Sequence, residues 1–335
     1  VQPLKSVLLA VRARRIPVVA HLHIVHPLET RLYNALHQVA LAVGVSEASV
    51  AGLREDGMDP ARLRVIYNGV DPARLDGAPA GLRANIGLAP DDLVLVSVGS
   101  LIPRKGVDVL VLAMAELART HRRAHLVLVG DGPQRAECER RAAAAGLAGR
   151  IHFLGEQTEV GPILRECDIA VSAARQEAFP LSLLEAAYCG LPIVASDIPP
   201  HEESVVRDVT GVLTPLDDPT VLAATLAALA GDGERRRAMG ERGAARVREC
   251  FLLRHCIAAF EDAYAGLLAA PRSRYGWARG SSWPRAYWSW LGRAAARRVP
   301  SLRSRPVSGA RQTVDAVRRP NVPTTDPEPF PHPRA

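Results

Sequence analysis

Short apolar runs alternate with longer amphipathic stretches along most of the chain. From residue 93 onwards the apolar runs are rich in Val, Leu and Ile, as in Leu93–Val98. Such runs are typical of strands buried on both faces of a parallel sheet, and the stretches between them have helical spacing. We expect strands at residues 93–98, 125–129, 151–154, 168–172, 192–195 and 211–213. We expect helices at residues 105–119, 133–145, 159–166, 181–189, 200–206 and 218–230.

The first 75 residues show the same alternation in a shorter form. Strands are expected at residues 16–23, 42–46 and 63–67, and helices at residues 4–13, 28–40 and 47–56. This alternation predicts an α/β fold with two Rossmann-like, doubly wound domains. Because the first domain has about three expected strands and the second about six, we expect the first domain to be truncated, with its beginning missing before Val1.

Proline, glycine and charge divide the chain further. Residues 271–335 contain thirteen Arg, three acidic residues and ten Pro, a composition that predicts a disordered tail without a compact fold. Since the whole chain carries a net charge of +7, residues 1–270 carry about −3, so a nucleic-acid-binding core is not indicated. The predicted organisation is a partial first domain at 1–75, a linker at 76–90, a second domain at 91–250, a closing helix at 251–270 and the tail at 271–335.

The cysteines and the tail bear on where the protein acts. Five cysteines, none of them in a CxxC pair, favour a reduced chain in the cytoplasm. No apolar run approaches the roughly 18 residues that a membrane-spanning helix needs. All four Trp lie in the tail among Arg and Tyr, which makes residues 271–300 a candidate peripheral membrane contact. A partner-binding tail and a disordered tail without such a role stay open, and we expect no nucleic-acid partner.

The strongest motif consists of two glutamates eight residues apart, Glu177 and Glu185, with Phe-Pro between them. The proline fits the first turn of a helix, where its missing N–H would have no partner in any case. The amides of Leu181 and Ser182 would then face the carboxyl edge of the preceding strand, at the positive end of the helix dipole, which suits a phosphate. A glutamate near a helix start is also explained by the dipole alone, so the spacing counts only together with its strand–turn–helix context.

A second motif follows the first strand of the second domain. Gly99 and Ser100 lead through a turn into Arg104, Lys105 and Gly106. The lysine places a cation at the same sheet edge as the expected phosphate site, where it can neutralise a leaving diphosphate. The alternative is that the two cations simply form the solvated start of a helix.

Two weaker signals complete the candidate set. Gly130-Asp131-Gly132 follows a strand and permits close backbone approach to a ligand, although it also fits an ordinary turn. His21 and His23 alternate on a strand and share a face, but no carboxylate or cysteine lies nearby in sequence, so we expect no metal site.

Together these motifs resemble those of the retaining glycosyltransferases of family 4 (group 1), which have the GT-B fold of two Rossmann-like domains. The similarity extends over about residues 17–268 and is most specific at residues 177–192. The resemblance implies that Glu177 contacts the donor sugar and that Glu185 contacts the ribose hydroxyls. It also implies that Lys105 clamps the diphosphate.

The resemblance assigns the remaining site residues as well. In the family an arginine assists the lysine; Ser100 stands at its place here, and Arg104 is the candidate substitute. His23 falls where the first domain presents a histidine to the donor sugar. The donor pocket is expected to be lined by Gly99, Gly130, Asp131, Phe153, Gly155, Phe179, Leu181 and Ser182.

The implied function is transfer of a hexosyl-type sugar from a UDP- or GDP-linked donor to a glycan or lipid-linked acceptor. The resemblance implies retention of configuration, with the departing phosphate taking the acceptor proton, and it implies neither a metal nor a cofactor. Two alternatives stay open: a non-catalytic nucleotide-sugar-binding module, and a nucleotide-sugar epimerase or a phosphorylase of the same fold. Donor binding without turnover would favour the module.

Overall fold

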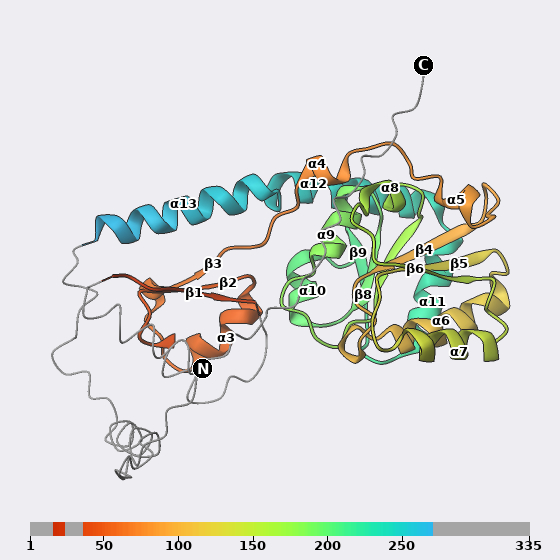
Figure 1. Cartoon of the computed structure of the whole chain (residues 1–335), viewed down its shortest axis with the longest axis horizontal. Helices are drawn as coiled ribbons and strands as arrows, with labels where there is room; N and C mark the ends of the chain where they lie inside the picture. Colours follow the sequence, from red (N-terminus) through yellow and green to blue (C-terminus); the bar gives the residue numbers. More distant parts are fainter. Residues whose placement is uncertain (1–15, 24–35, 271–335) are drawn as a thin grey trace, which may run out of the picture. The chain divides into compact units, whose positions relative to one another are not determined.

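The computed structural model describes residues 16–23 and 36–270 and shows an α/β protein with two parallel sheets (Figure 1). One sheet has the strand order β1-β2-β3, and the other has the order β6-β5-β4-β7-β8-β9. The expected α/β fold with two parallel sheets is confirmed, and the six-stranded sheet has the doubly wound strand order. The expected helix at 4–13, most of the one at 28–40 and the predicted tail at 271–335 lie outside the described residues.

The first sheet consists of β1 (Val19–Leu22), β2 (Leu41–Gly44) and β3 (Leu63–Val65). All four residues of β2 are buried, as expected for a central strand. Helix α3 (Glu47–Glu55) follows β2 at once, because Ser46 is its N-cap: the Ser46 hydroxyl accepts a hydrogen bond from the Ser49 amide at 3.1 Å. The start of α3 therefore has a defined position.

The second sheet contains six parallel strands, and their order determines where a ligand can bind. β4 lies beside β7 at the centre, so the chain winds outwards in both directions from this pair. In such sheets the crevice forms at the carboxyl ends of the two central strands. The strand bounds are β4 (Leu93–Val98), β5 (Ala124–Val129), β6 (Ile151–Gly155), β7 (Ile169–Ser172), β8 (Ile193–Ser196) and β9 (Gly211–Thr214).

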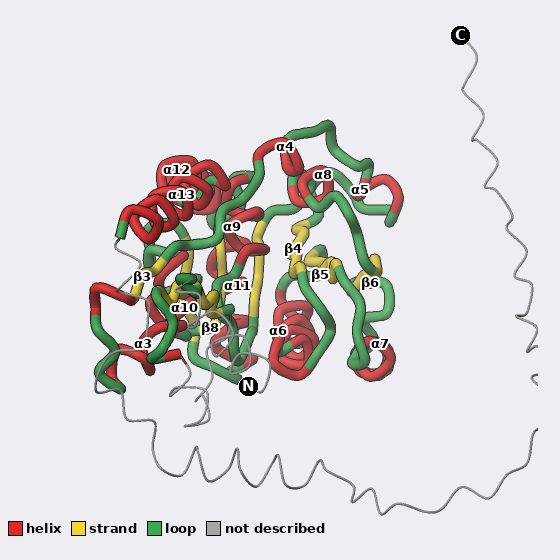
Figure 2. The backbone as a smooth tube through the Cα atoms, turned by 60° about the vertical axis from the view of Figure 1, so that its left-hand side comes forward, coloured by secondary structure: helices red, strands yellow, loops and turns green. Residues whose placement is uncertain are grey.

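Helices cover both faces of this sheet (Figure 2). Alternate residues of β4 face two separate cores: Leu95 joins the core of α6, α7 and α11, and Val96 joins the core of α8, α9 and α12. The four inner strands β4, β5, β7 and β8 are mostly apolar because both of their faces are covered. The helices are α6 (Val107–Thr120), α7 (Arg135–Ala144), α8 (Gly161–Leu164), α9 (Leu181–Tyr188), α10 (Pro199–Ser204), α11 (Pro219–Ala230) and α12 (Gly233–Cys250).

The connection between the sheets includes residues 76–90, the predicted linker, and has helical segments of its own. It contains two short helices, α4 (Pro72–Leu75) and α5 (Leu82–Asn85). The Glu166 carboxylate accepts from the amide of Leu82 at 2.8 Å, and Arg83 pairs with Asp168 at 2.8 Å. These partners lie more than eighty residues along the chain, so composition alone could not reveal them.

The long helix α13 (Leu253–Ala269) packs on the first sheet. Its Ala263 is buried in one cluster with Leu41, Val43 and Ile66. The Val70 amide donates to the Phe251 carbonyl at 2.9 Å, and the Leu253 amide donates to the Val70 carbonyl at 2.8 Å, so the segment before α13 pairs with the chain leaving β3. Within residues 16–23 and 36–270, no helix has the length and apolar character needed to cross a bilayer.

A histidine pair joins β5 to β6. His125 Nδ1 lies 3.2 Å from His152 Nε2, and His125 Nε2 lies 3.8 Å from an Asp92 carboxylate oxygen. Burial lowers the pKa of His125 and of His152. In a hydrogen bond between two imidazoles one nitrogen must accept, so the pair requires at least one neutral ring.

Acidification is expected to destabilise the fold through this pair. Because the pKa of each ring is lower in the folded chain than in the unfolded chain, the unfolded state binds more protons as the pH falls below about 6.5. The free energy of unfolding should therefore be highest above that pH and fall from pH 7 towards pH 5. The slope, measured by urea denaturation at several pH values, should be smaller in a His125→Gln/His152→Gln variant.

The control for the histidine pair is His121→Gln, because His121 precedes β5 and hydrogen-bonds Thr120 instead. This variant should keep the wild-type slope. Equal slopes in the wild type and the double variant would contradict the proposed pH dependence.

Candidate functional site

Three charged side chains meet at the carboxyl ends of β4 and β7. The Lys105 ammonium forms an ion pair with Glu177 Oε1, and Arg104 Nη1 lies 3.4 Å from Glu177 Oε2. The Glu177 side chain is only 10% exposed and that of Lys105 19%, whereas Arg104 is 47% exposed. The two expected loops therefore do meet, with one carboxylate between two cations.

The sequence predicts that Lys105 is the first residue of a helix. In the structure Lys105 instead belongs to a tight turn that precedes the helix. Pro103–Lys105 form a 3-10 turn, and α6 begins only at Val107. Gly106 between them has a φ of +64°, in the left-handed region that favours glycine. This turn lets Arg104 and Lys105 reach the same carboxylate, although adjacent side chains usually diverge.

Arg175 anchors the β7–α9 loop (residues 173–180), and sequence reasoning did not single it out. Its guanidinium binds both carboxylate oxygens of Asp108 at 3.0 and 2.8 Å, and Asp217 at 2.6 Å. The Arg175 amide donates to the Arg104 carbonyl at 2.8 Å, which ties this loop to the loop after β4. Hydrogen bonds from Arg175 hold the pKa of Asp108 below its usual value. The only feature of the sequence that could have indicated this role of Arg175 is its place in the loop that was predicted to carry Glu177.

The start of α9 differs in one respect from the expectation. The Leu181 amide donates to the Phe179 carbonyl at 3.1 Å, so it is not directed towards the crevice. The Ser182 amide has no acceptor among the residues that the structure describes. The Ser182 amide therefore remains a candidate hydrogen-bond donor to a phosphate. Leu181, which is 38% exposed, can contact a ligand only through its side chain.

Glu185 lies one turn into α9 and is half-buried. Burial raises its pKa, and the charge of Arg74 opposes this rise. A carboxylate that is partly removed from water gains most from neutral hydroxyl donors such as those of a ribose. The environment of Glu185 is therefore compatible with its predicted role, which stays a prediction.

Arg135 and a backbone hydrogen bond hold the loop after β5 against strand β6. The Arg135 guanidinium donates to Asp131 at 2.9 Å and to the Phe153 carbonyl at 3.3 Å, and it lies 5.8 Å from the centre of the Phe153 ring. The Gly132 amide, followed by Arg135, lowers the pKa of Asp131. The Gly130 amide donates to the Gly155 carbonyl at 2.8 Å. The predicted base-pocket residues thus lie together around a cation that the sequence did not reveal.

Close backbone contacts hold these loops against β4. The Gly99 amide donates to the Val129 carbonyl at 2.9 Å, and a Cβ on Gly130 would lie 2.1 Å from the Gly99 carbonyl oxygen. Only glycine fits at such a distance. Ser100 is exposed, and its carbonyl accepts from the Ile102 amide at 3.0 Å.

The first sheet contributes less to the described site. His23 is exposed at the end of β1, with its ring 5.9 Å from that of His21, and its predicted contact with a donor sugar stays a prediction. A further histidine of this segment, His26, lies outside the described residues. Within residues 16–23 and 36–270, no three His, Cys, Asp or Glu side chains are grouped so that they could hold a metal ion.

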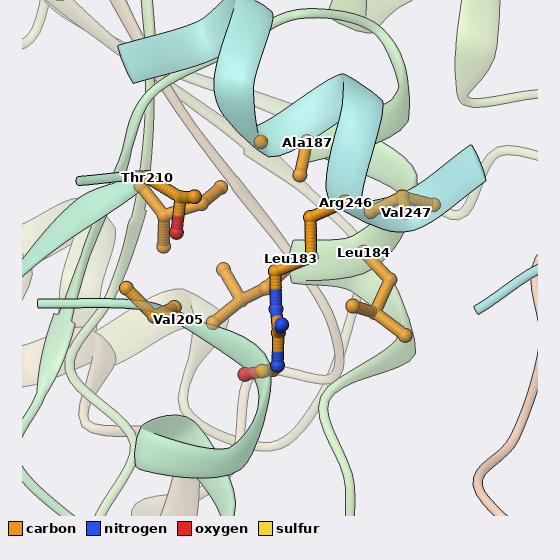
Figure 3. Close-up of a pocket in the computed structure, with 10 residues that line it drawn as sticks. Leu183, Leu184, Ala187, Val205, Thr210, Arg246 and Val247 are labelled. Atoms are coloured by element: carbon orange, nitrogen blue, oxygen red, sulfur yellow. The ribbon is translucent and has the colours of Figure 1, made fainter. Parts of the chain in front are cut away.

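A small pocket lies on the other side of α9 and does not coincide with the crevice. Arg246 of α12 extends along it beside Leu183 (Figure 3). The Arg246 guanidinium donates to the Glu203 carbonyl at 3.2 Å. The pocket is mostly apolar and belongs to the packing of α9 against α12; its lining is Leu183, Leu184, Ala187, Ile193, Ser204, Val205, Thr210, Gly243, Arg246 and Val247.

Two family models match the chain. Glycosyl transferases group 1 matches residues 81–246, and Glycosyltransferase Family 4 matches residues 2–74. The D-inositol 3-phosphate glycosyltransferase of Segniliparus rotundus is 32% identical over 194 residues, which is 56% of this chain and 43% of that protein. The N-acetyl-alpha-D-glucosaminyl L-malate synthase of Bacillus anthracis is 28% identical over 207 residues, 62% of this chain and 54% of that protein.

Solved structures show the same fold. Anabaena Alr3699/HepE, crystallised in complex with UDP and glucose, has a TM-score of 0.71 and 25% sequence identity; the match covers 79% of this chain and 75% of that one. The chain spans about half the length of the curated relatives it matches. The matches at 2–74 and 81–246 together extend over most of the described residues, and the chain belongs to the group 1 glycosyltransferases of family 4, with the GT-B fold.

Proposed function

We propose that this protein transfers a sugar from a nucleotide-diphosphate sugar to an acceptor hydroxyl, with retention of configuration and without a metal. The observation that carries the proposal is the cluster of Lys105, Arg104 and Glu177 at the carboxyl ends of β4 and β7. A lysine ammonium has three hydrogens and can pair with Glu177 and a diphosphate at once. Two cations beside one carboxylate leave a net positive charge for the leaving group.

The proposed step requires the residues to position groups and stabilise charge. The acceptor oxygen forms its bond to the anomeric carbon on the face from which the diphosphate departs. The bond from that carbon to the phosphate oxygen breaks, and the departing phosphate takes the acceptor proton. Lys105 and Arg104 stabilise the negative charge that develops on the diphosphate, Glu177 contacts the sugar, and Glu185 contacts the ribose.

The donor and the acceptor are proposed from the relatives. The Anabaena protein was crystallised with UDP, so we propose a UDP-linked donor rather than a GDP-linked one. The names of two relatives contain D-inositol 3-phosphate and L-malate, which are small hydroxylated anions. We propose an acceptor of this kind; the expected glycan or lipid-linked acceptor is the alternative.

The proposal is tested by binding and then by turnover. Isothermal titration of the full chain with UDP and GDP should show binding of UDP. Release of UDP from UDP-sugars should then depend on an added acceptor, such as inositol phosphate. Failure to bind either nucleotide would refute the proposed site, and UDP binding without turnover would favour a binding module. Interconversion of free UDP-sugars would favour an epimerase.

We also propose a cytoplasmic protein with a peripheral membrane contact through residues 271–300. This segment contains seven Arg, no acidic residue, and four Trp and two Tyr. Arginine and aromatic residues together bind anionic lipid surfaces. Flotation of the full chain with phosphatidylglycerol vesicles, but not with phosphatidylcholine vesicles, is the expected result; equal flotation, or none, would contradict the contact.

A further inference from the structure

The amide groups at the start of α3 are bound by a carboxylate from the other sheet's α10. Glu203 Oε2 accepts from the Glu47 amide at 2.7 Å, and Glu203 Oε1 accepts from the Ala48 amide at 3.0 Å. The first amides of a helix have no partner within the helix, and the helix dipole adds to their attraction for an anion. Since Ser46 caps the Ser49 amide, Glu203 completes the capping of this turn.

Tyr67 binds the same carboxylate. Its hydroxyl hydrogen-bonds Glu203, and burial, followed by the charge of Glu203, raises the pKa of Tyr67 to about 12. The tyrosine is therefore protonated at neutral pH and donates to Glu203. The Glu203 carboxylate thus binds both the start of α3 and Tyr67, which lies just after β3.

The ring of Tyr67 connects this carboxylate to the β7–α9 loop. It lies 5.0 Å from the ring of Phe179 and 5.5 Å from that of Phe251, and Phe179 lies 5.7 Å from Phe251. Phe179 is 6% exposed and Phe251 is 3% exposed, so neither ring can move without disturbing the others. Phe179 stands two residues after Glu177, whose carboxylate binds Lys105.

We infer that Glu203 and Tyr67 are positioning residues that couple the start of α3 to the β7–α9 loop. They act through Phe179, which fixes the loop between Glu177 and α9. One consequence of the inference rests on the proposed function: a nucleotide that orders the β7–α9 loop also orders the start of α3. By thermodynamic reciprocity, loosening α3 then weakens nucleotide binding.

Hydrogen exchange measured on the full chain tests the coupling without any ligand. Glu47→Pro deletes one amide bound by Glu203 at a position where proline suits a helix start, and Glu47→Ala keeps that amide. We expect Glu47→Pro, relative to Glu47→Ala, to speed exchange in the peptide spanning residues 174–183 by about threefold or more. In a Tyr67→Phe background the same comparison should show no difference, because the ring at position 67 still packs on Phe179 but no longer has the hydroxyl that binds Glu203.

A second measurement uses UDP as the ligand. UDP should slow exchange at residues 47–50 in the wild type but not in Tyr67→Phe or Glu203→Gln. The control is Glu202→Gln, the exposed neighbour on α10, which should behave as the wild type. Both positioning variants should weaken UDP binding by about 3- to 10-fold, as expected for the loss of one hydrogen bond.

The outcomes separate this inference from the proposed function. If Glu47→Pro loosens the loop equally with and without the Tyr67 hydroxyl, or if it does not loosen the loop at all, the coupling is wrong. If the ligand-free coupling is found but the wild type binds neither UDP nor GDP, the positioning role holds and the proposed function fails. UDP protection of residues 47–50 that persists in Tyr67→Phe would also overturn the coupling.

Discussion

A Lys105→Met variant is expected to lower sugar transfer at saturating donor by about 100-fold or more. Lys105 is the less exposed of the two cations at Glu177, and its ammonium is directed by the turn that ends at Gly106. Removing it would leave the developing charge on the diphosphate with only Arg104 for support. Initial rates of UDP release over a range of donor concentrations measure the effect.

Two further measurements distinguish a chemical effect from misfolding. Thermal unfolding should show a loss of about 1–3 kcal/mol, because Glu177 loses one charged partner. UDP binding should weaken by about 10-fold, and the greater loss of turnover would show that Lys105 acts mainly in the transition state. A variant that keeps its fold and retains turnover within threefold of the wild type would refute the assignment.

Arg104→Ala is the matched comparison for this prediction. The Arg104 side chain is 47% exposed, and its contact with Glu177 is long, at 3.4 Å. An exposed cation acts through a medium of high dielectric constant and stabilises a nearby charge less, so we expect a loss of turnover of only about 3- to 10-fold. The ratio between the two variants therefore tests how far Arg104 takes the place of the arginine that Ser100 replaces.

The sequence predicts best those parts of the fold that depend on nearby residues. The six strands of the second sheet were predicted to within one or two residues of their bounds, because most of them are apolar runs buried on both faces. The meeting of Lys105 and Glu177, 72 residues apart, could also be expected, since both follow central parallel strands. The incorrect helix start at Lys105 arose because the left-handed conformation of Gly106 separates the 3-10 turn from α6.

Contacts between distant segments account for most of what could not be predicted. Arg175 reaches Asp108 and Asp217 over 67 and 42 residues, and Glu203 binds the start of α3 over 156 residues. Charged residues are common on protein surfaces, so nothing in the sequence distinguishes these from solvated ones. The Leu181 amide is a local error: the conformation of Phe179 and Pro180 turns it back onto a carbonyl.

Gly106→Ala is expected to lower the free energy of unfolding by about 3–5 kcal/mol and to abolish measurable transfer. Gly106 has a φ of +64°, where a residue with a Cβ loses roughly 1–2 kcal/mol. The added Cβ would also lie 1.9 Å from the Ala173 carbonyl oxygen and 2.7 Å from its carbonyl carbon. Both atoms belong to backbone at the end of β7, so the neighbour cannot withdraw by changing a rotamer.

A Gly146→Ala variant separates the backbone strain of a positive φ from the close contact between a Cβ and Ala173. Gly146 has a φ of +71°, but a Cβ there would meet no atom within 4 Å, so only the backbone strain of about 1–2 kcal/mol is expected. Urea denaturation of both variants measures the difference. If Gly106→Ala is as stable as Gly146→Ala, the close approach to Ala173 is not what fixes this turn. If it is less stable by the expected margin, the loss of transfer follows from geometry: the residue before Gly106 carries the ammonium, and Ala173 begins the loop that carries Glu177.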